Sequence, residues 1–200
     1  MSKPGLGFFL SQRSFIQVSW TKPLEGWFKL NSDGASVGNP AREGGGGLLR
    51  DSNRHWVKGY ARSIGFTTSV IAELWALRDG LNLALSEGIR SLIVELDARV
   101  VVDLIKSNVD SSKLYFLLLC DCRCLLREFH WVHQVQHVFR EGNCPVDALA
   151  RWGCSMNNAF AVFNHPPSAD ILCLINSDLA GVCNVSIVRT TCNGLTFGVG

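Results

Sequence analysis

The stretch Phe28-Lys29-Leu30-Asn31-Ser32-Asp33-Gly34-Ala35 predicts an apolar strand that carries a carboxylate to the beginning of a turn. Strand alternation puts Phe28 and Leu30 on one face and the polar residues between them on the other. Gly34 directly follows Asp33, and a glycine permits a sharp turn and leaves space beside the acid. A carboxylate at the end of a central strand is a place where a metal or a phosphate can approach the backbone.

Strand and turn signals alternate on the C-terminal side of this stretch. Residues 36–40 have the composition of a loop, and the glycine run 44–47 would permit close backbone packing in a second strand. From Ser69 the apolar period changes to about 3.6, which predicts a helix. The expected strands are 28–33, 45–50, 55–63, 91–97 and 130–138, and the expected helices are 69–87, 98–106, 113–128 and one from Pro145. This order predicts an antiparallel meander followed by parallel strands of the same sheet.

Length and composition favour one globular domain. Two hundred residues with 47% hydrophobic content can bury a substantial core. We expect a lead-in segment at residues 1–26, a domain at 27–153, and a poorly ordered or loosely docked appendix at 154–200. The net charge of +2 neither requires nor forbids a polyanionic partner.

The cysteine pattern favours a reducing compartment. All eight cysteines lie in the second half of the chain, and none has a Cys-x-x-Cys spacing, so we expect free thiols. The apolar stretch at residues 5–10 is too short for a secretory signal, and no apolar run reaches the ~20 residues that span a bilayer. The expected location is therefore the cytosol or the nucleus, with no membrane association.

Four acids occupy comparable positions: Asp33 and Asp97 at strand ends, Glu73 in a helix, and Asp147 in a late helix. If the two strands are adjacent and parallel, their ends lie about 4.8 Å apart, which brings Asp33 and Asp97 together. Converging carboxylates repel one another unless cations neutralise them. Oxygen ligands suit Mg²⁺ or Mn²⁺, and two such ions ~3.5–4 Å apart can activate a water for attack on a phosphodiester.

In these motifs the chain resembles the type 1 ribonuclease H family, and more closely its plant stand-alone or retroelement-derived form. The resemblance covers about residues 20–152. The matching blocks are Leu30-Asn31-Ser32-Asp33-Gly34-Ala35, Gly38-Asn39-Pro40, Gly45-Gly46-Gly47-Leu48-Leu49-Arg50-Asp51-Ser52, Ala72-Glu73-Leu74-Trp75-Ala76-Leu77, Val94-Glu95-Leu96-Asp97, Arg140-Glu141-Gly142-Asn143 and Asp147-Ala148-Leu149-Ala150.

The resemblance implies an α/β fold with a five-stranded mixed sheet, three strands antiparallel and then two parallel, flanked by helices. It also implies hydrolysis of the RNA strand of RNA–DNA hybrids with two divalent ions, Mg²⁺ or Mn²⁺. By position, Asp33 would touch both ions, Glu73 and Asp97 would sit on one side, and Asp147 would complete the second ion's site. The family's catalytic histidine falls on His137. The implied substrate-binding residues are Gly34, Asn39, Thr68, Ser69, Arg99 and Asn143.

Three departures from the family pattern leave a rival reading open. Ala98 follows Asp97 where relatives usually carry a hydroxyl residue, Val146 precedes Asp147 where alanine is usual, and the connection 107–113 is poor in basic residues. The rival is a nucleic-acid-binding or interaction domain that kept the fold of a retroelement enzyme and lost turnover. An integrase-like nuclease is a more distant alternative.

The spacing of His130, His133 and His137 also has two readings. On a helix, spacings of three and four would suggest a metal site. We favour a strand, because Trp131 and the valines of this stretch are strand formers.

Overall fold

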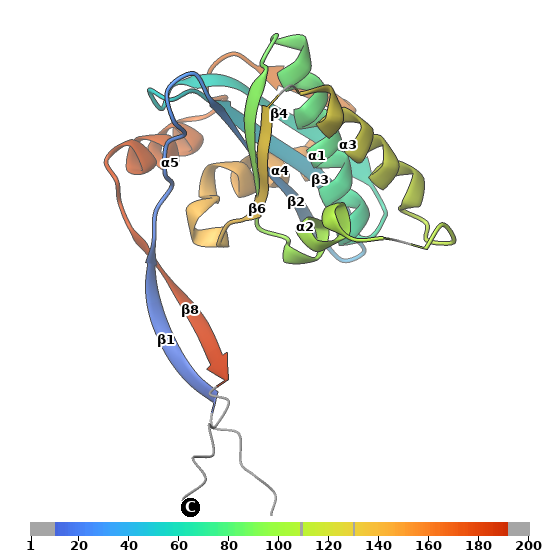
Figure 1. Ribbon diagram of the computed structural model, residues 1–200, viewed down its shortest axis with the longest axis horizontal. Coiled ribbons are helices and arrows are strands. Elements are labelled where there is room, and N and C mark those ends of the chain that lie inside the picture. Colours follow the sequence, from blue (N-terminus) through green and yellow to red (C-terminus); the bar gives the residue numbers. More distant parts are fainter. Residues whose placement is uncertain (1–10, 109, 130, 192–200) are drawn as a thin grey trace, which may run out of the picture.

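A six-stranded mixed sheet forms the centre of the computed structural model, which describes residues 11–108, 110–129 and 131–191 (Figure 1). The strand order is β6-β5-β2-β3-β4-β7. The strands are β2 (Phe28–Gly38), β3 (Ala41–Arg50), β4 (Trp56–Gly65), β5 (Ser91–Leu96), β6 (Trp131–His137) and β7 (Phe160–Phe163). The meander β2-β3-β4 is antiparallel, while β5 runs parallel to β2 and β6 runs parallel to β5. The predicted α/β architecture is confirmed, with β7 as an additional strand antiparallel to β4.

Helices cover both faces of this sheet (Figure 1). They are α1 (Ser69–Ser86), α2 (Arg99–Lys106), α3 (Phe116–Glu128), α4 (Cys144–Ser155) and α5 (Ala169–Leu179). The main core lies between the sheet and α1, α2 and α3, and it contains Leu30, Leu77 and Val94. A second core, containing Leu48 and Ile171, lies under α4 and α5. No helix among the described residues has the length and apolar character needed to cross a membrane.

The glycine run of β3 lets helices approach the sheet from both sides. Successive residues of a strand point to opposite faces. A Cβ on Gly45 would lie 3.0 Å from the Ala76 Cβ of α1, and a Cβ on Gly46 would lie 2.6 Å from the Leu149 carbonyl carbon of α4. The close packing predicted for this run is therefore present, and it fixes α1 and α4 against the strand next to Asp33.

We expect Gly46→Ala to lower the free energy of unfolding by about 2–3 kcal/mol, because the new methyl group meets helix backbone that cannot move aside easily. Urea denaturation followed by circular dichroism measures the effect. Ser36→Ala, on the exposed end of β2, is the control and should change stability by less than about 0.5 kcal/mol. Equal midpoints for the two variants would contradict the packing argument.

The predicted turn directly after Asp33 is wrong. Strand β2 continues to Gly38 and pairs with β3 down to the Gly38–Ala41 pair, so the hairpin turn lies at Asn39 and Pro40. Gly34 serves close packing instead: a Cβ there would lie 2.7 Å from the Glu73 backbone nitrogen. Helix α1 can therefore reach the strand only because residue 34 has no side chain.

The segments flanking the predicted domain contain more regular structure than we expected. The described part of the appendix forms β7, α5 and β8 (Asn184–Thr191), and the lead-in forms β1 (Ser11–Val18). Strands β1 and β8 pair as an antiparallel ribbon that projects from the body (Figure 1). The expected low order of the appendix is thus corrected for β7 and α5, whose contacts with β4 and α4 give them a place in the domain. Residues 1–10 and 192–200 lie outside the described residues.

A buried polar network ties both flanking segments to the sheet. On the face of β2 opposite Leu30, the Lys29 ammonium donates to Glu95 at 2.7 Å, and the Asn31 amide donates to the same carboxylate at 2.9 Å. The Trp20 indole of the lead-in donates to Asn31 at 2.9 Å.

Arg50 extends this network to the C-terminal helix. Its guanidinium lies 3.7 Å from the centre of the Trp20 ring and donates to the Asp178 carboxylate of α5 at 2.6 Å. Arg50 is 1% exposed, so its charge depends on these partners.

The described cysteines, which are all of them except Cys192, are free thiols.

The strand predicted for residues 130–138 is confirmed by β6, so the histidines there do not share a helix face. Residue 130 itself lies outside the described residues.

Candidate active site

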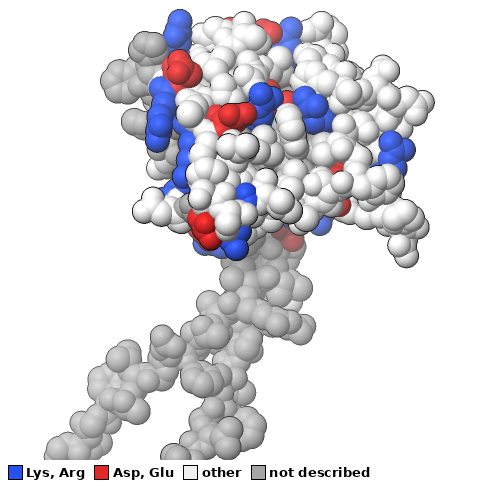
Figure 2. All heavy atoms as spheres, turned by 90° about the vertical axis from the view of Figure 1, so that its right-hand side faces the viewer, with Lys and Arg blue, Asp and Glu red and all other residues white. Residues whose placement is uncertain are grey.

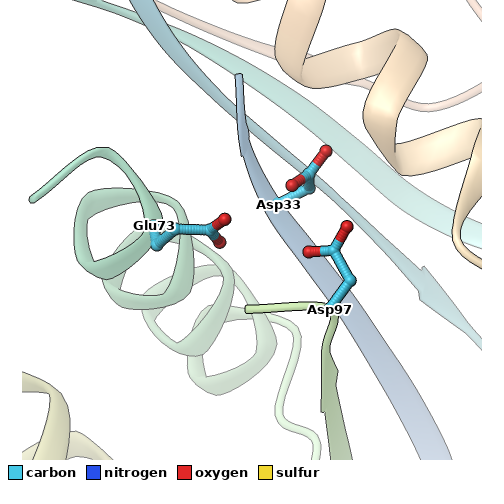
Figure 3. A group of neighbouring side chains, drawn as sticks. All are labelled: Asp33, Glu73 and Asp97. Atoms are coloured by element: carbon cyan, nitrogen blue, oxygen red, sulfur yellow. The ribbon is translucent and has the colours of Figure 1, made fainter. Parts of the chain in front are cut away.

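Three of the four predicted acids meet at one point of the fold. Asp33, Glu73 and Asp97 each offer a carboxylate oxygen, and these oxygens lie within 4.8 Å of one another. Figure 3 shows the three side chains pointing toward one another from β2, α1 and the end of β5. The expected convergence of acids that are distant in the sequence is therefore present for these three.

The strand register explains why Asp33 and Asp97 are neighbours. Strands β2 and β5 pair in parallel up to Ser32 and Leu96, and the next residue of each strand is an acid. Glu73 comes from the second turn of α1, which the missing side chain of Gly34 allows to lie against β2. Two backbone features thus place three carboxylates in one pocket.

The acids are buried, and each has an oxygen without a partner. Asp33 is 3% exposed and Glu73 is 7% exposed, and Asp97 is half-buried. In this group, three buried carboxylate oxygens have no hydrogen-bond donor: Asp33 Oδ2, Glu73 Oε2 and Asp97 Oδ1. Buried polar atoms are nearly always satisfied, so three unsatisfied oxygens in one pocket indicate a missing positive partner.

Burial and mutual repulsion raise the pKa values of these groups. Burial, followed by the negative charge of Asp97, raises the pKa of Asp33 to about 8. Burial and then the charge of Asp33 raise the pKa of Glu73 well above its ordinary value, and burial raises the pKa of Asp97. Without a cation, the site therefore holds protons that carboxylates normally lose far below neutral pH.

The donor set fits a hard divalent cation. The pocket has a volume of about 260 Å³ and is lined by Asp33, Gly34, Glu73, Asp97, Ala98 and Arg140. All the negatively charged ligand atoms in it are carboxylate oxygens, which Mg²⁺ and Mn²⁺ prefer over softer metals. Asp33, Glu73 and Asp97 are the residues that would hold such an ion.

We expect cation affinity to rise with pH up to about 8, since a cation must displace the proton that Asp33 holds. Below that pH, each unit of acidification should weaken Mn²⁺ binding about tenfold for each proton displaced. Isothermal titration calorimetry in buffers of matched ionic strength measures the dependence. The Asp33→Asn variant should show a shallower dependence, and an affinity of the wild type that does not change with pH would contradict this assignment.

The fourth acid, Asp147, lies next to the group but is held by arginines. It belongs to the first turn of α4, where its charge contributes to the raised pKa of Asp33. One carboxylate oxygen pairs with Arg140, and the other pairs with Arg151 at 3.0 Å. The structure therefore places Asp147 beside the site without joining it to the three-acid group.

Arg140 is the site residue that the sequence reasoning missed. It begins the short 3-10 turn η1 (Arg140–Gly142), and it lines the pocket of the three acids while pairing with Asp147. The signal was present, because Arg140 belongs to the Arg-Glu-Gly-Asn block that carries the family resemblance. The sequence predicted no role for Arg140, because a turn separates it from Asp147 and the spacing of seven residues does not specify their distance in space.

His137 does not line the acid pocket. It is the last residue of β6, opposite Leu96 in the register, and its ring makes an edge contact with Phe139 at 5.4 Å between centres. Its assignment as the catalytic histidine stays a prediction that the pocket geometry does not support.

Five of the predicted substrate-binding residues line the pocket or lie at exposed positions, and the sixth is buried. Gly34 lines the pocket, Thr68 is the N-cap of α1 and accepts from the Ile71 backbone nitrogen, and exposed positions are held by Asn39, Ser69 and Arg99. Asn143 is fully buried, and its amide nitrogen lies 3.5 Å from the Ser32 carbonyl oxygen. Its predicted substrate contact stays a prediction that this burial does not support, because the amide packs between the start of α4 and β2.

The departures from the family pattern leave the acids in place. Val146 is fully buried in the core under α5, away from the carboxylates, so its extra bulk is accommodated by Ile171 and Ile175. Ala98 lines the pocket and caps α2 without a side-chain hydrogen bond.

A mixed sheet with acids at the ends of adjacent parallel strands and a third acid on the covering helix defines a ribonuclease H-like domain. Known structures share this fold. The RNase H1 of the halophilic archaeon Halobacterium salinarum is 28% identical with a TM-score of 0.58, and the match covers 64% of this chain and 96% of that one. The N-terminal RNase H domain of a Mycobacterium tuberculosis protein is 25% identical with a TM-score of 0.59, and the match covers 64% and 93%.

The chain belongs to the reverse transcriptase-like family, whose model matches residues 31–153. A relative from Arabidopsis thaliana with a provisional ribonuclease H name is 34% identical over 172 residues. That match covers 86% of this chain and 27% of the relative, so the chain spans about a quarter of the relative's length. LC11-RNase H1, solved in complex with an RNA/DNA hybrid, is 21% identical with a TM-score of 0.57 over 64% of this chain and 96% of that one, and it shares the fold.

Proposed function

We propose that this chain is a metal-dependent endonuclease that hydrolyses the RNA strand of RNA–DNA hybrids. The observation that carries the proposal is the convergence of Asp33, Glu73 and Asp97, with one unsatisfied oxygen on each, in a single pocket. Family membership and the fold shared with RNase H1 enzymes support the same chemistry. The plant retroelement origin and a cytosolic or nuclear location are part of the proposal.

In this mechanism the three acids would position the scissile phosphate through the divalent ions that they hold. Asp33, Glu73 and Asp97 would hold divalent ions, and such ions would activate a water and neutralise charge on the leaving oxygen. Asp33 would serve both ions, as the family resemblance implies, and Asp147 would complete the second site once it leaves its arginines. The exposed start of α1 at Thr68 and Ser69 offers backbone N–H groups and hydroxyls to a phosphate of the DNA strand.

Recognition of a hybrid needs no base sequence. Contacts to 2′-hydroxyls across a shallow minor groove distinguish RNA from DNA, and the exposed Asn39 and Arg99 are candidates for such contacts. The direct test uses hybrids labelled on the RNA or the DNA strand, with double-stranded RNA and double-stranded DNA as controls. Cleavage of the RNA strand of the hybrid alone, dependent on Mg²⁺ or Mn²⁺, is the expected result, and cleavage of DNA would contradict the proposal.

We propose that basic residues of α2 and α3 help to hold the hybrid, outside the connection 107–113 that is poor in basic residues. A hollow of about 340 Å³ between α2 and α3 is lined by Ile105, Lys106, Ser107, Asn108, Arg123, Leu126 and Arg127. Arg123 donates to the Leu104 carbonyl oxygen at 2.6 Å and so caps the end of α2, whereas Lys106 and Arg127 form no ion pair within the described part of the chain. Figure 2 shows Lys and Arg side chains at several places on one side of the molecule, with Asp and Glu side chains among them.

Helix α2 links this hollow to the acids. Asp97 precedes the first turn of α2, and Lys106 ends it. Eight residues rise about 12 Å, or ~3–4 nucleotide steps along a strand. Lys106 and Arg127 can therefore contact the hybrid backbone a few nucleotides from the cleaved bond.

We expect the Lys106→Gln/Arg127→Gln variant to bind hybrid more weakly and to lower the salt slope of log K by roughly two, one for each lost phosphate contact. Fluorescence anisotropy over a salt series with Ca²⁺ in place of Mg²⁺ measures it. A matched variant, Arg54→Gln/Lys58→Gln, removes the same charge from strand β4 and the turn before it, and it should leave the slope unchanged. Equal slopes for wild type and the Lys106/Arg127 variant would remove this contact from the proposal.

The second candidate is a domain that binds nucleic acid without turnover. The pairing of Asp147 with two arginines favours it, because a fourth ligand held in this way would leave one metal site incomplete. Hybrid binding without product in both Mg²⁺ and Mn²⁺ would select this candidate.

A further inference from the structure

Arg140 brings a positive charge to the acid pocket. Of the residues that line the pocket of Asp33, Glu73 and Asp97, Arg140 is the one with a positive charge, and it also pairs with Asp147. One guanidinium therefore faces four carboxylates. We propose that Arg140 is a displaceable counter-ion, which rests among these acids in the cation-free protein and leaves them when divalent ions bind. This inference rests on the proposed function, because it concerns how divalent ions gain access to the same acids.

The need for a counter-ion follows from the charges. Three buried carboxylates within 4.8 Å repel one another strongly in a medium of low dielectric constant. Arg140 lines the same pocket, so its positive charge offsets part of this repulsion. Arg140 thus lets the three-acid pocket exist before a metal arrives.

The contact is built so that it can open. The Arg140 side chain is 63% exposed, whereas its partner Asp147 is 16% exposed. Ion pairs with an exposed arginine contribute little free energy, so a divalent ion can compete for the carboxylate. Arg140 also begins the three-residue turn η1, and the exposure of its side chain leaves it a path into solvent.

Arg151 provides a matched comparison. It pairs with the other oxygen of Asp147 at 3.0 Å and is 59% exposed, but it does not line the acid pocket. Arg140→Gln and Arg151→Gln each remove one positive charge and one ion pair from Asp147. The two variants differ in whether the lost charge faces Asp33, Glu73 and Asp97.

The test is Mn²⁺ binding to the whole chain, measured by calorimetry and by the electron paramagnetic resonance signal of free Mn²⁺. We expect Arg140→Gln to bind Mn²⁺ at least about fivefold more tightly than the wild type, and Arg151→Gln to change affinity by less than about twofold. Equal effects of the two variants, or no gain from Arg140→Gln, would overturn the counter-ion role. Circular dichroism checks that both variants fold.

Two further measurements separate this inference from the proposed function. Asp33→Asn should abolish the tight Mn²⁺ site, and retention of that site would contradict the proposed function and the inference together. In the wild type, adding diamagnetic Mg²⁺ should move the Arg140 Nε–H resonance and speed its exchange with solvent. An unchanged resonance, with Mg²⁺ bound at the acids, would overturn the inference alone.

Discussion

Asp33→Asn is expected to lower the rate of hybrid cleavage by roughly 10³-fold or more, because a ligand placed to serve two cations supplies several kcal/mol to the transition state. Asparagine has nearly the shape of the protonated acid, so the pocket keeps its form while its affinity for cations falls. Single-turnover cleavage of a hybrid with a labelled RNA strand measures the loss. Asp103→Asn, exposed on α2, is the control and should cleave like the wild type.

The same variant should be more stable than the wild type when no cation is present. The pKa of Asp33 is raised to about 8, so the folded protein binds this proton more tightly than the unfolded chain does. The stability that the proton provides is present at low pH and is lost as the pH rises through about 8. Near pH 8 without metal, we expect Asp33→Asn to gain roughly 1–3 kcal/mol, since the neutral amide removes repulsion. Full cleavage activity of Asp33→Asn, or a loss of its stability, would contradict the proposed site.

Asp178→Ala is expected to lower the free energy of unfolding by about 3–5 kcal/mol, because it leaves the Arg50 guanidinium buried without its carboxylate. The Arg50–Asp178 distance is 2.6 Å, and the arginine side chain is 1% exposed. Chemical denaturation measures the loss. Thermal unfolding of the same samples checks whether the transition remains a single step.

Asp170→Ala on the same helix is the matched control. Asp170 is exposed in the first turn of α5, so its removal should cost less than about 1 kcal/mol through the helix dipole alone. If the two variants were equally stable, the Arg50–Asp178 ion pair would not hold α5 to the sheet. A large difference would show that a fragment ending at the family boundary, residue 153, lacks a partner that the sheet requires.

The sequence was sufficient for the sheet and for three acids, since both depend on local signals. Period-two and helical patterns located the strands and helices, and acids at the ends of two strands predicted the meeting of Asp33 with Asp97. The glycine run also predicted close packing from a local signal, because several successive residues without side chains let helices lie close to a strand.

The sequence was insufficient where the outcome depended on contacts between distant segments. Strand β7 has four residues, too few for a period, and its place is set by pairing with β4. Asn143 looks like a surface polar residue in the sequence, and only the packing of α4 against β2 buries it. The turn expected at Gly34 failed because a glycine that serves a neighbouring helix has the same local appearance as one that serves a turn.

Arg140 and Asp147 show the same limit at the site. Their ion pair depends on how η1 joins β6 to α4, which no residue spacing specifies. The family motif identified Asp147 as a candidate ligand. Its pairing with Arg140 and Arg151 depends on the three-dimensional arrangement of η1 and α4.

The most direct test of the acid site is the anomalous scattering of Mn²⁺ in crystals of the whole chain grown near pH 8. We expect a peak about 2.0–2.2 Å from oxygens of Asp33, Glu73 and Asp97, with the Arg140 guanidinium displaced from the pocket. The absence of Mn²⁺ from these carboxylates at saturating concentration, with Arg140 still among them, would contradict the metal-dependent nuclease proposed for this fold.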